Sequence, residues 1–340
     1  MRIADLPAAP PGKAGWPWTE DSGSGQASES IPGWPKVSII TPSFNQGEYL
    51  EETIRSVLLQ DYDELEYIII DGGSTDNSFE IICKYAAYLS YYVSEKDAGQ
   101  ANAINKGLKR ATGDWIGWIN SDDYFLPGAL STLLGAARAS DSAEWVSGSV
   151  LFLNDDPNEP TEVRRQGKNR QLIDWLLQKE HFHQPGTFWK RSLLSRIGYL
   201  NEAMHYAFDW EFWCRLAADN LSPLAVDAPV AAFRLHDESK TCTSWDRFCS
   251  DNDRILAEFL PSFHGKERKE LEKRRTSLVC TRIRHEAMRL LGEARGFEVA
   301  RHVINGVVER PGILTKKTPY LFLLRSILSP LTLLISKRHD

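Results

Sequence analysis

The chain contains only five cysteines in 340 residues, and no two of them have the C-x-x-C spacing. An odd number without such a pair predicts neither a zinc knuckle nor a disulfide framework. Residues 1–7 also lack the continuous apolar stretch of a secretory signal. We therefore expect a cytoplasmic protein in a reducing compartment.

Positive charge is not in excess either, because the formal net charge is −6. A surface of this sign disfavours nonspecific nucleic-acid binding, so no nucleic-acid partner is expected. A composition of 42% hydrophobic and 25% charged residues excludes a wholly disordered chain. At roughly 150 residues per domain, the length predicts about two domains, and no internal repeat is visible.

A long uninterrupted apolar run is missing as well. Residues 320–335 fall short of the roughly 20 apolar residues that cross a bilayer, and Arg325 and Pro330 interrupt them. From residue 261 on there are 17 Lys and Arg against 8 Asp and Glu, compared with 23 against 38 before. Two interpretations stay open for segment 264–340: a helix docked on the body, or peripheral contact with anionic lipid on the inner face of the cytoplasmic membrane.

Composition divides the chain into three parts. Residues 1–35 are rich in Pro, Gly and Ser without a helical or strand period, which predicts a flexible leader. Residues 36–250 carry the regular pattern of a folded domain. Residues 251–340 are basic and helical in pattern, which predicts a C-terminal helical extension.

Short apolar strands alternate with amphipathic helices in the second part. The expected strands are residues 37–40, 67–70, 91–93 and 115–119. This alternation predicts an α/β fold, a Rossmann-like, mostly parallel sheet with helices on both faces. Ligands of such sheets bind beyond the carboxyl ends of the strands. The indoles of Trp145, Trp175 and Trp245 are expected in the core.

Acidic residues follow two of these strands. Asp122 and Asp123 come directly after an apolar strand, where bound Mg²⁺ or Mn²⁺ would compensate their charge; an acidic helix start is the alternative. Asp71 closes another apolar strand and precedes Gly72 and Gly73, which allow close backbone approach. It could accept a hydrogen bond from a base or a ribose, or simply belong to a capped turn.

Three segments, 37–45, 70–76 and 118–123, together resemble the family-2 glycosyltransferases of the glycosyltransferase A fold. Residues 206–213 are similar to the segment of that family that delivers the catalytic base, and residues 234–236 resemble its late histidine motif. The resemblance covers roughly residues 36–240. It departs from the family where Gly72 and Phe208 stand in place of acids, and where Asn102 stands in place of an aspartate.

The resemblance implies an inverting transferase that uses Mn²⁺ or Mg²⁺ and a nucleotide-diphosphate sugar, with a UDP-sugar favoured. The acceptor would be a hydroxyl of a glycan or a lipid-linked molecule, in polysaccharide, glycolipid or cell-envelope glycan synthesis. The site residues implied are Thr41, Pro42, Ser43, Asn45, Asp71, Gly73, Gln100, Asn102 and Asp122 for the donor; Asp122, Asp123 and His236 for the metal; Asp209 as base; and His183, Gln184 and Trp210 on the acceptor side. The sequence leaves open which of the two adjacent acids is the main metal ligand.

Two other functions are compatible with a nucleotide-binding fold of this kind. A sugar-nucleotide nucleotidyltransferase would carry a glycine-rich basic loop after the first strand, and residues 41–46 contain none. A noncatalytic nucleotide-sugar-binding protein could lose its base, whereas this chain keeps Asp209 together with Asp122 and Asp123. The sequence therefore favours the transferase.

Overall fold

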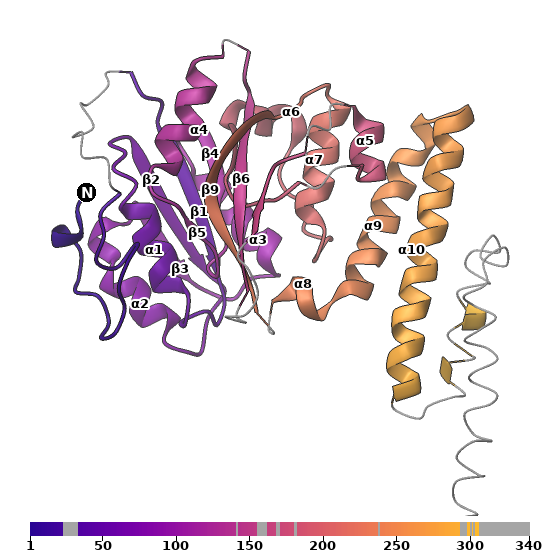
Figure 1. Cartoon of the computed structure of the whole chain (residues 1–340), viewed down its shortest axis with the longest axis horizontal. Coiled ribbons are helices and arrows are strands. Elements are labelled where there is room, and N and C mark those ends of the chain that lie inside the picture. The colour runs from indigo at the N-terminus through magenta and orange to yellow at the C-terminus, as the bar shows by residue number, and fades with distance from the viewer. Residues whose placement is uncertain are drawn as a thin grey trace, which may run out of the picture. The chain divides into compact units, whose positions relative to one another are not determined.

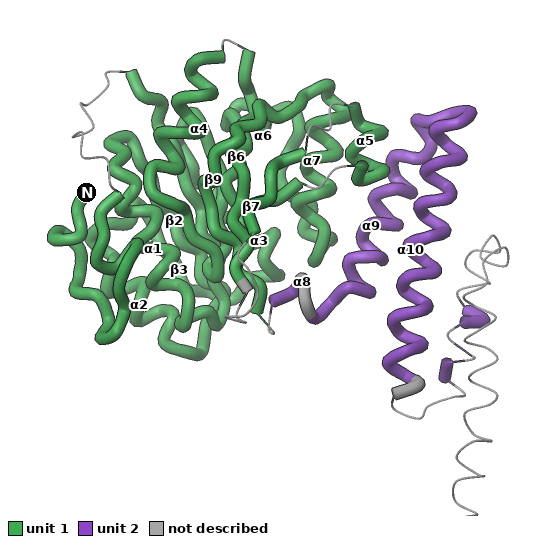
Figure 2. Tube along the Cα trace, in the orientation of Figure 1, with its two compact units in different colours: residues 1–236 green, residues 237–340 purple. Residues whose placement is uncertain are grey.

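The computed structural model describes residues 1–22, 33–140, 142–154, 162–167, 171–179, 182–236, 239–292, 298–299, 301 and 303–305. The chain divides into two compact units, residues 1–236 and 237–340 (Figure 2). The boundary predicted after residue 250 falls inside a continuous helix, α9 (Trp245–Phe259), so the division comes earlier than the composition indicated.

Unit 1 is built on a mixed sheet (Figure 1). Within the described residues it has nine strands, in the order β3-β2-β1-β4-β8-β6-β9-β5, with β7 paired to β6. They are β1 (Val37–Ser43), β2 (Leu65–Asp71), β3 (Tyr91–Ser94), β4 (Trp115–Trp118), β5 (Tyr124–Phe125), β6 (Trp145–Asn154), β7 (Glu162–Arg164), β8 (Thr187–Lys190) and β9 (Leu224–Leu235). Strands β3, β2, β1, β4, β6 and β9 share one direction, and β5, β7 and β8 oppose it. The mostly parallel sheet is confirmed.

Helices cover both faces of this sheet. They are α1 (Leu50–Leu58), α2 (Ser78–Lys84), α3 (Gln100–Arg110), α4 (Ala129–Arg138), α5 (Leu172–Leu177), α6 (Leu194–Ile197) and α7 (Phe208–Ala218), with short 3₁₀ turns at Ile3–Asp5, Ala86–Tyr88 and Arg191–Leu193. Since β1 is buried along its whole length, its side chains alternate between two apolar layers.

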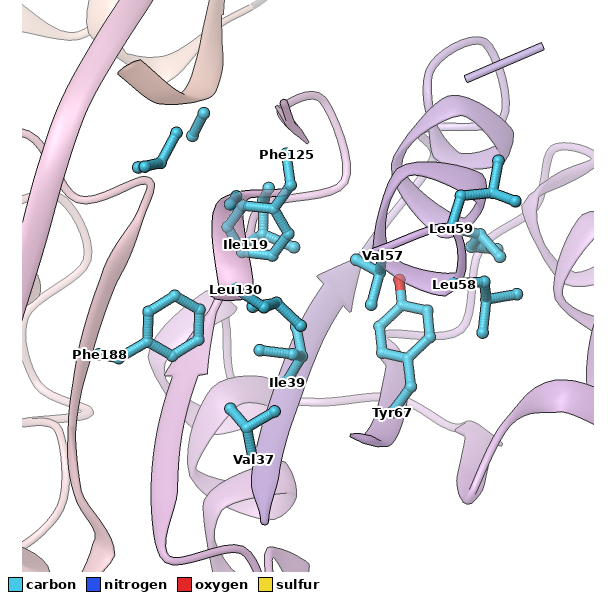
Figure 3. Close-up of a cluster of buried hydrophobic side chains, with 14 of the residues drawn as sticks. Val37, Ile39, Val57, Leu58, Leu59, Tyr67, Ile119, Phe125, Leu130 and Phe188 are labelled. Atoms are coloured by element: carbon cyan, nitrogen blue, oxygen red, sulfur yellow. The ribbon is translucent and has the colours of Figure 1, made fainter. Parts of the chain in front are cut away.

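One layer lies between the sheet and helices α1, α2 and α4. Val37 and Ile39 of β1 and Tyr67 of β2 pack there against α1 side chains such as Val57 (Figure 3). All four side chains are buried to about 99% or more. This apolar cluster joins the first half of the chain to α4 and β9 and contributes the main hydrophobic stabilisation of unit 1.

The other layer is dominated by tryptophans. Trp145 stacks between Trp175 and Trp213, and Trp213 stacks in turn on Trp118. Trp145 and Trp175 are therefore core residues, as the sequence predicted. The prediction for Trp245 is wrong, because that side chain begins α9 and is 49% exposed.

Residues 1–22 differ most from expectation. Instead of behaving as a flexible leader, they pack on unit 1, with Leu6 and Trp18 buried. Arg55 of α1, itself fully buried, donates hydrogen bonds to three main-chain carbonyls of this segment. Burial of two large side chains and satisfaction of a buried guanidinium outweigh the proline-rich composition.

Unit 2 is helical in its described residues: α8 (Lys240–Thr243), α9, a 3₁₀ turn at Leu260–Ser262, and α10 (Gly265–Gly292). Arg275 of α10 pairs with Asp253 of α9 at 2.7 Å. No helix in the described part of the chain is long and apolar enough to cross a membrane. The apolar segment 320–335 lies outside the described residues.

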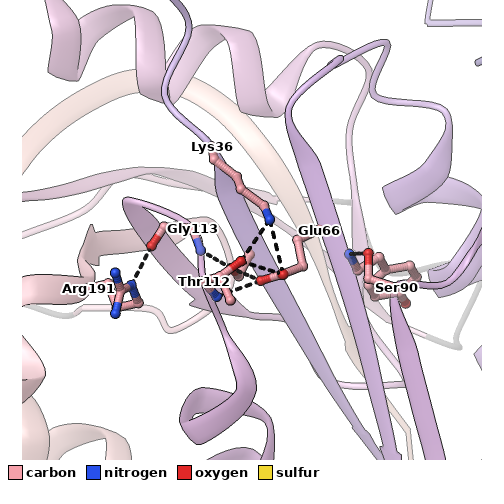
Figure 4. Close-up of polar contacts among 8 residues, drawn as sticks. Lys36, Glu66, Ser90, Thr112, Gly113 and Arg191 are labelled. Carbon is pink, nitrogen blue, oxygen red and sulfur yellow. Dashed lines mark hydrogen bonds and ion pairs between the residues drawn. The ribbon is translucent and has the colours of Figure 1, made fainter.

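A polar network closes the amino ends of β1, β2 and β4, opposite the edge where ligands bind such sheets (Figure 4). Glu66 of β2 accepts hydrogen bonds from Lys36 Nζ, Ser38 Oγ and the main-chain N–H of Thr112. Burial alone would raise the pKa of Glu66, but these bonds outweigh it and lower the pKa to about 2. We therefore assign the network a role in the stability of unit 1 and not in ligand binding.

Replacing Glu66 with glutamine is expected to destabilise unit 1 by about 1–3 kcal/mol at pH 7. The folded pKa lies below the ordinary 4.5, so the stabilisation is present above 4.5 and is lost as the pH falls toward about 2. Urea unfolding of both proteins from pH 7 to pH 4 would measure it. The difference should narrow at the acidic end, and equal stability at pH 7 would contradict the assignment.

Candidate active site

The loops after β1 and β2 are tied together at the carboxyl edge of the sheet. The Asn45 side chain accepts from Thr75 N–H at 2.8 Å, and the Asn45 N–H donates to Ser74 Oγ at 2.8 Å. Asn45 adopts a left-handed conformation with φ of 52°, which asparagine tolerates better than most residues. Asn45 and Gly73 thus lie on adjoining loops, and a contact of either residue with the donor stays a prediction.

Asp71 is fully buried and holds the β2 loop. Its carboxylate accepts from the N–H groups of Gly73 and Ser74 and from the hydroxyls of Ser74 and Ser94. A carboxylate has about four acceptor positions, so these bonds use its capacity in this conformation. The structure assigns Asp71 to shaping the loop, and a direct contact with the nucleoside stays a prediction.

The glycine that replaces a family acid has a physical reason. A Cβ atom on Gly72 would lie 2.6 Å from Asp97 Oδ2 and 3.3 Å from the Phe44 ring. Residue 72 therefore cannot carry a side chain unless Asp97 moves. An acidic group is still present at this place, but it comes from the loop after β3.

Three residues of β1 that the resemblance assigns to the sugar donor, Thr41, Pro42 and Ser43, have different surroundings because successive side chains of a strand point to opposite faces. Thr41 is buried, and its hydroxyl lies 3.0 Å from Tyr67 Oη in the core. Pro42 is buried near the carboxyl end of β1, and Ser43, the last residue of β1, is 3% exposed with no hydrogen bond to its Oγ among the described residues. Of these three residues, Thr41 is the one whose polar group is hydrogen-bonded within the core.

Helix α3 begins beside the turn that follows β4, residues 119–123, here called the acidic turn. Gln100 Nε2 donates to Asn120 Oδ1 at 2.8 Å, which joins α3 to the loop after β4. Asn102 faces elsewhere: its amide donates to Glu202 at 2.7 Å and its oxygen accepts from Ala98 N–H. Asn102 therefore fastens the segment that leads to α7, which explains why an aspartate, facing Glu202, would not suit this position.

The two adjacent acids have different surroundings. The Asp122 side chain is 22% exposed, and its Oδ2 lies 3.2 Å from His236 Nε2. Asp123 is 1% exposed and accepts the main-chain N–H of Arg234 at 3.0 Å. Burial first, and then the charge of Asp122, raise the pKa of Asp123 well above its ordinary value. Asp122 is the acid that a ligand can reach.

Three residues around this pair were not assigned from the sequence. The Tyr49 ring lies 4.9 Å from the His236 ring and 4.7 Å below the Arg234 guanidinium. Arg234 also donates to the main-chain oxygen of Asp122 and pairs with Glu52 at 3.3 Å. Arg234 appeared in the sequence only as part of the late histidine motif. Tyr49 and Glu52 carry no local signal beyond lying one turn apart at the start of α1.

The donor atoms at this place fit a divalent cation. In the described residues no cluster of three or more His, Cys, Asp or Glu side chains could hold a metal on its own. Asp122 and His236 offer one carboxylate and one imidazole, and two protein ligands leave positions for phosphate oxygens, as Mg²⁺ and Mn²⁺ sites commonly do. Asp123 does not suit a first ligand, because its oxygens face Arg234 and Asn120.

Asp209 lies at the start of α7, on the face of the sheet that Trp118 occupies. Its neighbour Phe208 packs on Trp118 with ring centroids 6.3 Å apart, and Asp122 follows Trp118 by four residues. Burial raises the pKa of Asp209 to about 6 from an ordinary 3.8, and the bond from Trp210 N–H offsets only part of this rise. A carboxylate with such a pKa suits general-base catalysis near neutral pH.

The acceptor-side residues are already engaged within the protein. Trp210 is buried, and its indole N–H donates to the Trp175 carbonyl at 3.1 Å. Gln184 is buried and donates to the Trp118 carbonyl at 2.8 Å. His183 packs against Phe152 at 4.9 Å. Trp210 therefore supports α7, and Gln184 lies at the end of β4, close to the acidic turn.

Comparison with known proteins agrees with this geometry. The family model described as glycosyl transferase family 2 matches residues 38–198. An uncharacterized glycosyltransferase of Mycobacterium tuberculosis is 31% identical over 192 residues, which cover 54% of this chain and 69% of that protein. One from Rickettsia typhi is 26% identical over 223 residues, covering 62% and 67%. In two further Rickettsia relatives the match spans 37% of their length.

Two solved structures share the fold. A fragment of TarS from S. aureus has a TM-score of 0.55 at 20% identity and covers 86% of this chain and 87% of its own. The mannosyltransferase PcManGT from Pyrobaculum calidifontis, in complex with GDP-Man and Mn²⁺, has a TM-score of 0.54 at 18% identity and covers 94% and 91%. With the relative from M. tuberculosis, the motifs and this architecture, the chain belongs to glycosyl transferase family 2.

Proposed function

We propose that the protein transfers a sugar from a nucleoside-diphosphate sugar, with a UDP-sugar favoured, to an acceptor hydroxyl with inversion at the anomeric carbon. The observation that carries the proposal is that two features adjoin β4: the Asp122–His236 pair lies just beyond it, and α7, which carries Asp209, packs on its last residue, Trp118. Asp122 and His236 offer a partly exposed cation site, and Asp209 offers a carboxylate with a pKa of about 6. A transferase of this kind needs both parts.

The donor would lie across the loops after β1, β2 and β3. Ser43 ends β1, Asn45 and Gly73 lie on adjoining loops, and Gln100 joins the start of α3 to the turn after β4. TarS has been solved with UDP, and PcManGT with GDP-Man and Mn²⁺. These neighbours support a nucleoside diphosphate as the recognised group.

Asp122 and His236 would hold Mn²⁺ or Mg²⁺. When bound, the ion supplies positive charge against the diphosphate that leaves. The Arg234 guanidinium, stacked over Tyr49 and bonded to the Asp122 main chain, adds fixed positive charge beside the same place. The chain's own contribution is to keep these groups oriented before the donor arrives.

Asp209 would take the proton of the acceptor hydroxyl. The acceptor oxygen then forms a bond to the anomeric carbon while the bond from that carbon to the diphosphate oxygen breaks, and the electron pair leaves with the nucleoside diphosphate. A single displacement of this kind inverts the anomeric centre and needs one base opposite the leaving group. Asp209 comes from α7, whereas Asp122 and His236 follow β4 and β9.

A glycan or lipid-linked hydroxyl of polysaccharide, glycolipid or envelope synthesis is the proposed acceptor, and the basic helix α10 is the proposed contact with a membrane surface. Lys266, Arg268, Lys269 and Lys273 are exposed on its first three turns. Basic side chains of this kind attract anionic lipid headgroups. The protein would then act at the inner face of the cytoplasmic membrane.

Thermal unfolding with UDP, GDP and dTDP, each with and without Mn²⁺, tests the donor and the metal together. A ligand present at 100 times its Kd stabilises the native state by about 2.7 kcal/mol, which corresponds to roughly 5–10 °C for a domain of this size. We expect the largest shift with UDP and Mn²⁺. A larger shift with GDP would change the assigned nucleobase of the donor from uracil to guanine. No shift with any nucleotide would reject the proposal.

An acceptor screen separates the enzyme from a nucleotide-sugar-binding protein. Release of UDP from a UDP-sugar in the presence of lipid-linked or glycan acceptors is expected to depend on Asp209. Binding without turnover in every such mixture would support the noncatalytic alternative instead.

A further inference from the structure

We infer that residues 1–22, here called the N-terminal strap, hold the metal and diphosphate site in shape by gripping helix α1 through Arg55. The strap lies outside the family match at residues 38–198. The inference rests on the proposed function, because it concerns the Asp122–His236 pair.

Arg55 joins helix α1 to the strap by hydrogen bonds. It is fully buried, and its guanidinium donates to the carbonyls of Pro7, Pro17 and Trp18 at 2.8, 3.0 and 3.3 Å. A fourth bond, at 3.0 Å, goes to Tyr85 Oη. Hydrogen bonds from a charged donor are strong, and a buried guanidinium without them is costly. Arg55 and the strap therefore depend on each other.

The next turn of α1 adds a second attachment on the same side. Glu51, one turn before Arg55, accepts hydrogen bonds from Lys84 and Tyr85. Lys84 in turn donates to the Ala8 carbonyl of the strap at 3.2 Å. Positions 51 and 55 lie on one face of the helix, so the strap holds α1 along that face.

Another face of α1 holds the acidic turn. Thr53 Oγ1 lies 2.9 Å and 2.6 Å from the main-chain oxygens of Ser121 and Asp123. Glu52 pairs with Arg234, and the ring of Tyr49, just before the helix, packs on His236. Helix α1 and the residue that precedes it thus contact the turn that carries Asp122, and also Arg234 and His236.

The strap also reaches the acidic turn directly. The indole N–H of Trp16 donates to the Phe125 carbonyl at 2.8 Å, and the Phe125 N–H donates to Ser56 of α1 at 3.1 Å. Phe125 follows Asp123 by two residues. The strap, α1 and β5 thus form one closed set of contacts around the turn.

Release of the strap is expected to act on the metal-dependent half of the site alone. Asp209 approaches from α7, whose Phe208 and Trp213 pack on Trp118 on the other face of the sheet. Arg55 and Trp16 are therefore positioning residues for the Asp122–His236 pair and not for the base. This separation gives a readout that a general loss of stability would not produce.

The test uses two full-length variants, Arg55→Lys and Trp16→Phe. The first keeps the charge but loses the forked donors, and the second removes one N–H donor and keeps an aromatic ring. Residues that support metal ligands typically change metal affinity by about 10–100-fold, and we expect that loss in Mn²⁺ affinity measured in the presence of UDP for Arg55→Lys. A smaller loss is expected for Trp16→Phe. The affinity for UDP without metal should stay unchanged. The pH at which kcat/KM falls on the acidic side, which reports the pKa of Asp209, should stay unchanged as well.

Trp34→Phe is the matched control, since it makes the same exchange outside the strap at a ring that packs on Tyr62. Wild-type Mn²⁺ affinity in a folded Trp16→Phe protein, together with the same result or no folding for Arg55→Lys, would overturn the inference. A change in the acidic limb of the kcat/KM pH profile as large as the change in Mn²⁺ affinity would also overturn it. If the wild-type protein binds no UDP with or without Mn²⁺, the proposed function fails, and this inference fails with it.

Discussion

Replacing Asp209 with asparagine is expected to abolish sugar transfer and, at the same time, to stabilise the protein. The amide cannot take the acceptor's proton, and loss of a general base costs about 10²–10⁴-fold in rate. The amide oxygen can still accept from Trp210 N–H, so the start of α7 is preserved. The buried charge disappears, and with it the cost that raises the pKa of the carboxylate.

The sign of the stability change follows from the two pKa values. The carboxyl titrates near 3.8 in the unfolded chain and at about 6 in the folded protein, so the folded state holds the proton more tightly. The native protein therefore loses stability as the pH rises from 3.8 to 6. At pH 7 the asparagine variant should be more stable by on the order of 1–3 kcal/mol, or several degrees in Tm, with no gain near pH 4.

Turnover and melting curves of the same preparations measure both effects. In the wild type, kcat/KM should fall as the pH drops through about 6, because the base becomes protonated. Asp227→Asn, at an exposed position of β9, makes the same chemical change and should alter neither property. Full transfer activity in the Asp209 variant, or a lower Tm at pH 7, would refute the role of Asp209.

The gathering of the site residues could be predicted from the sequence, because parallel strands bring their carboxyl ends to one edge. The turns after β1, β2 and β4 were located by their apolar strands and polar followers. The family resemblance then placed Asp209 and His236, which lie far along the chain. For these elements local pattern and tertiary arrangement agree.

The direction of individual side chains depended on partners remote in sequence. Asp122 and Asp123 are neighbours in the sequence, but their side chains have different partners. The Arg234 N–H of β9, more than a hundred residues later, donates to Asp123. Asn102 was assigned to the donor, but Glu202 engages it. No periodicity of residues 100–123 contains this information.

Composition misled at the N-terminus for a similar reason. The strap has no helical or strand period, and its carbonyls find their partner in one arginine of α1. An arginine in an amphipathic helix is ordinarily exposed, so nothing local marks Arg55 as buried. The alternation of β1, by contrast, does place Thr41 on the same side as Ile39, and the pattern could have indicated that its hydroxyl faces the core.

The second large effect is expected from Asp122→Asn, compared with the same exchange at Asp123. Asp122 is the exposed acid beside His236, so the variant should lose metal-dependent UDP binding by at least about 100-fold. Asparagine at position 123 keeps an oxygen for the Arg234 N–H and was never a free ligand. Its Mn²⁺ affinity should therefore fall by less than about tenfold.

Titration of Mn²⁺ in the presence of a fixed concentration of UDP ranks the two variants, and UDP binding without metal controls for the nucleotide site. The ranking is informative because both changes remove one formal charge from the same turn. A long-range electrostatic effect would weaken the two proteins alike, whereas direct ligation affects one of them. If Asp123→Asn proves the more damaging change, the buried acid must turn outward when the donor binds, and the metal site described by Asp122 and His236 is incorrect.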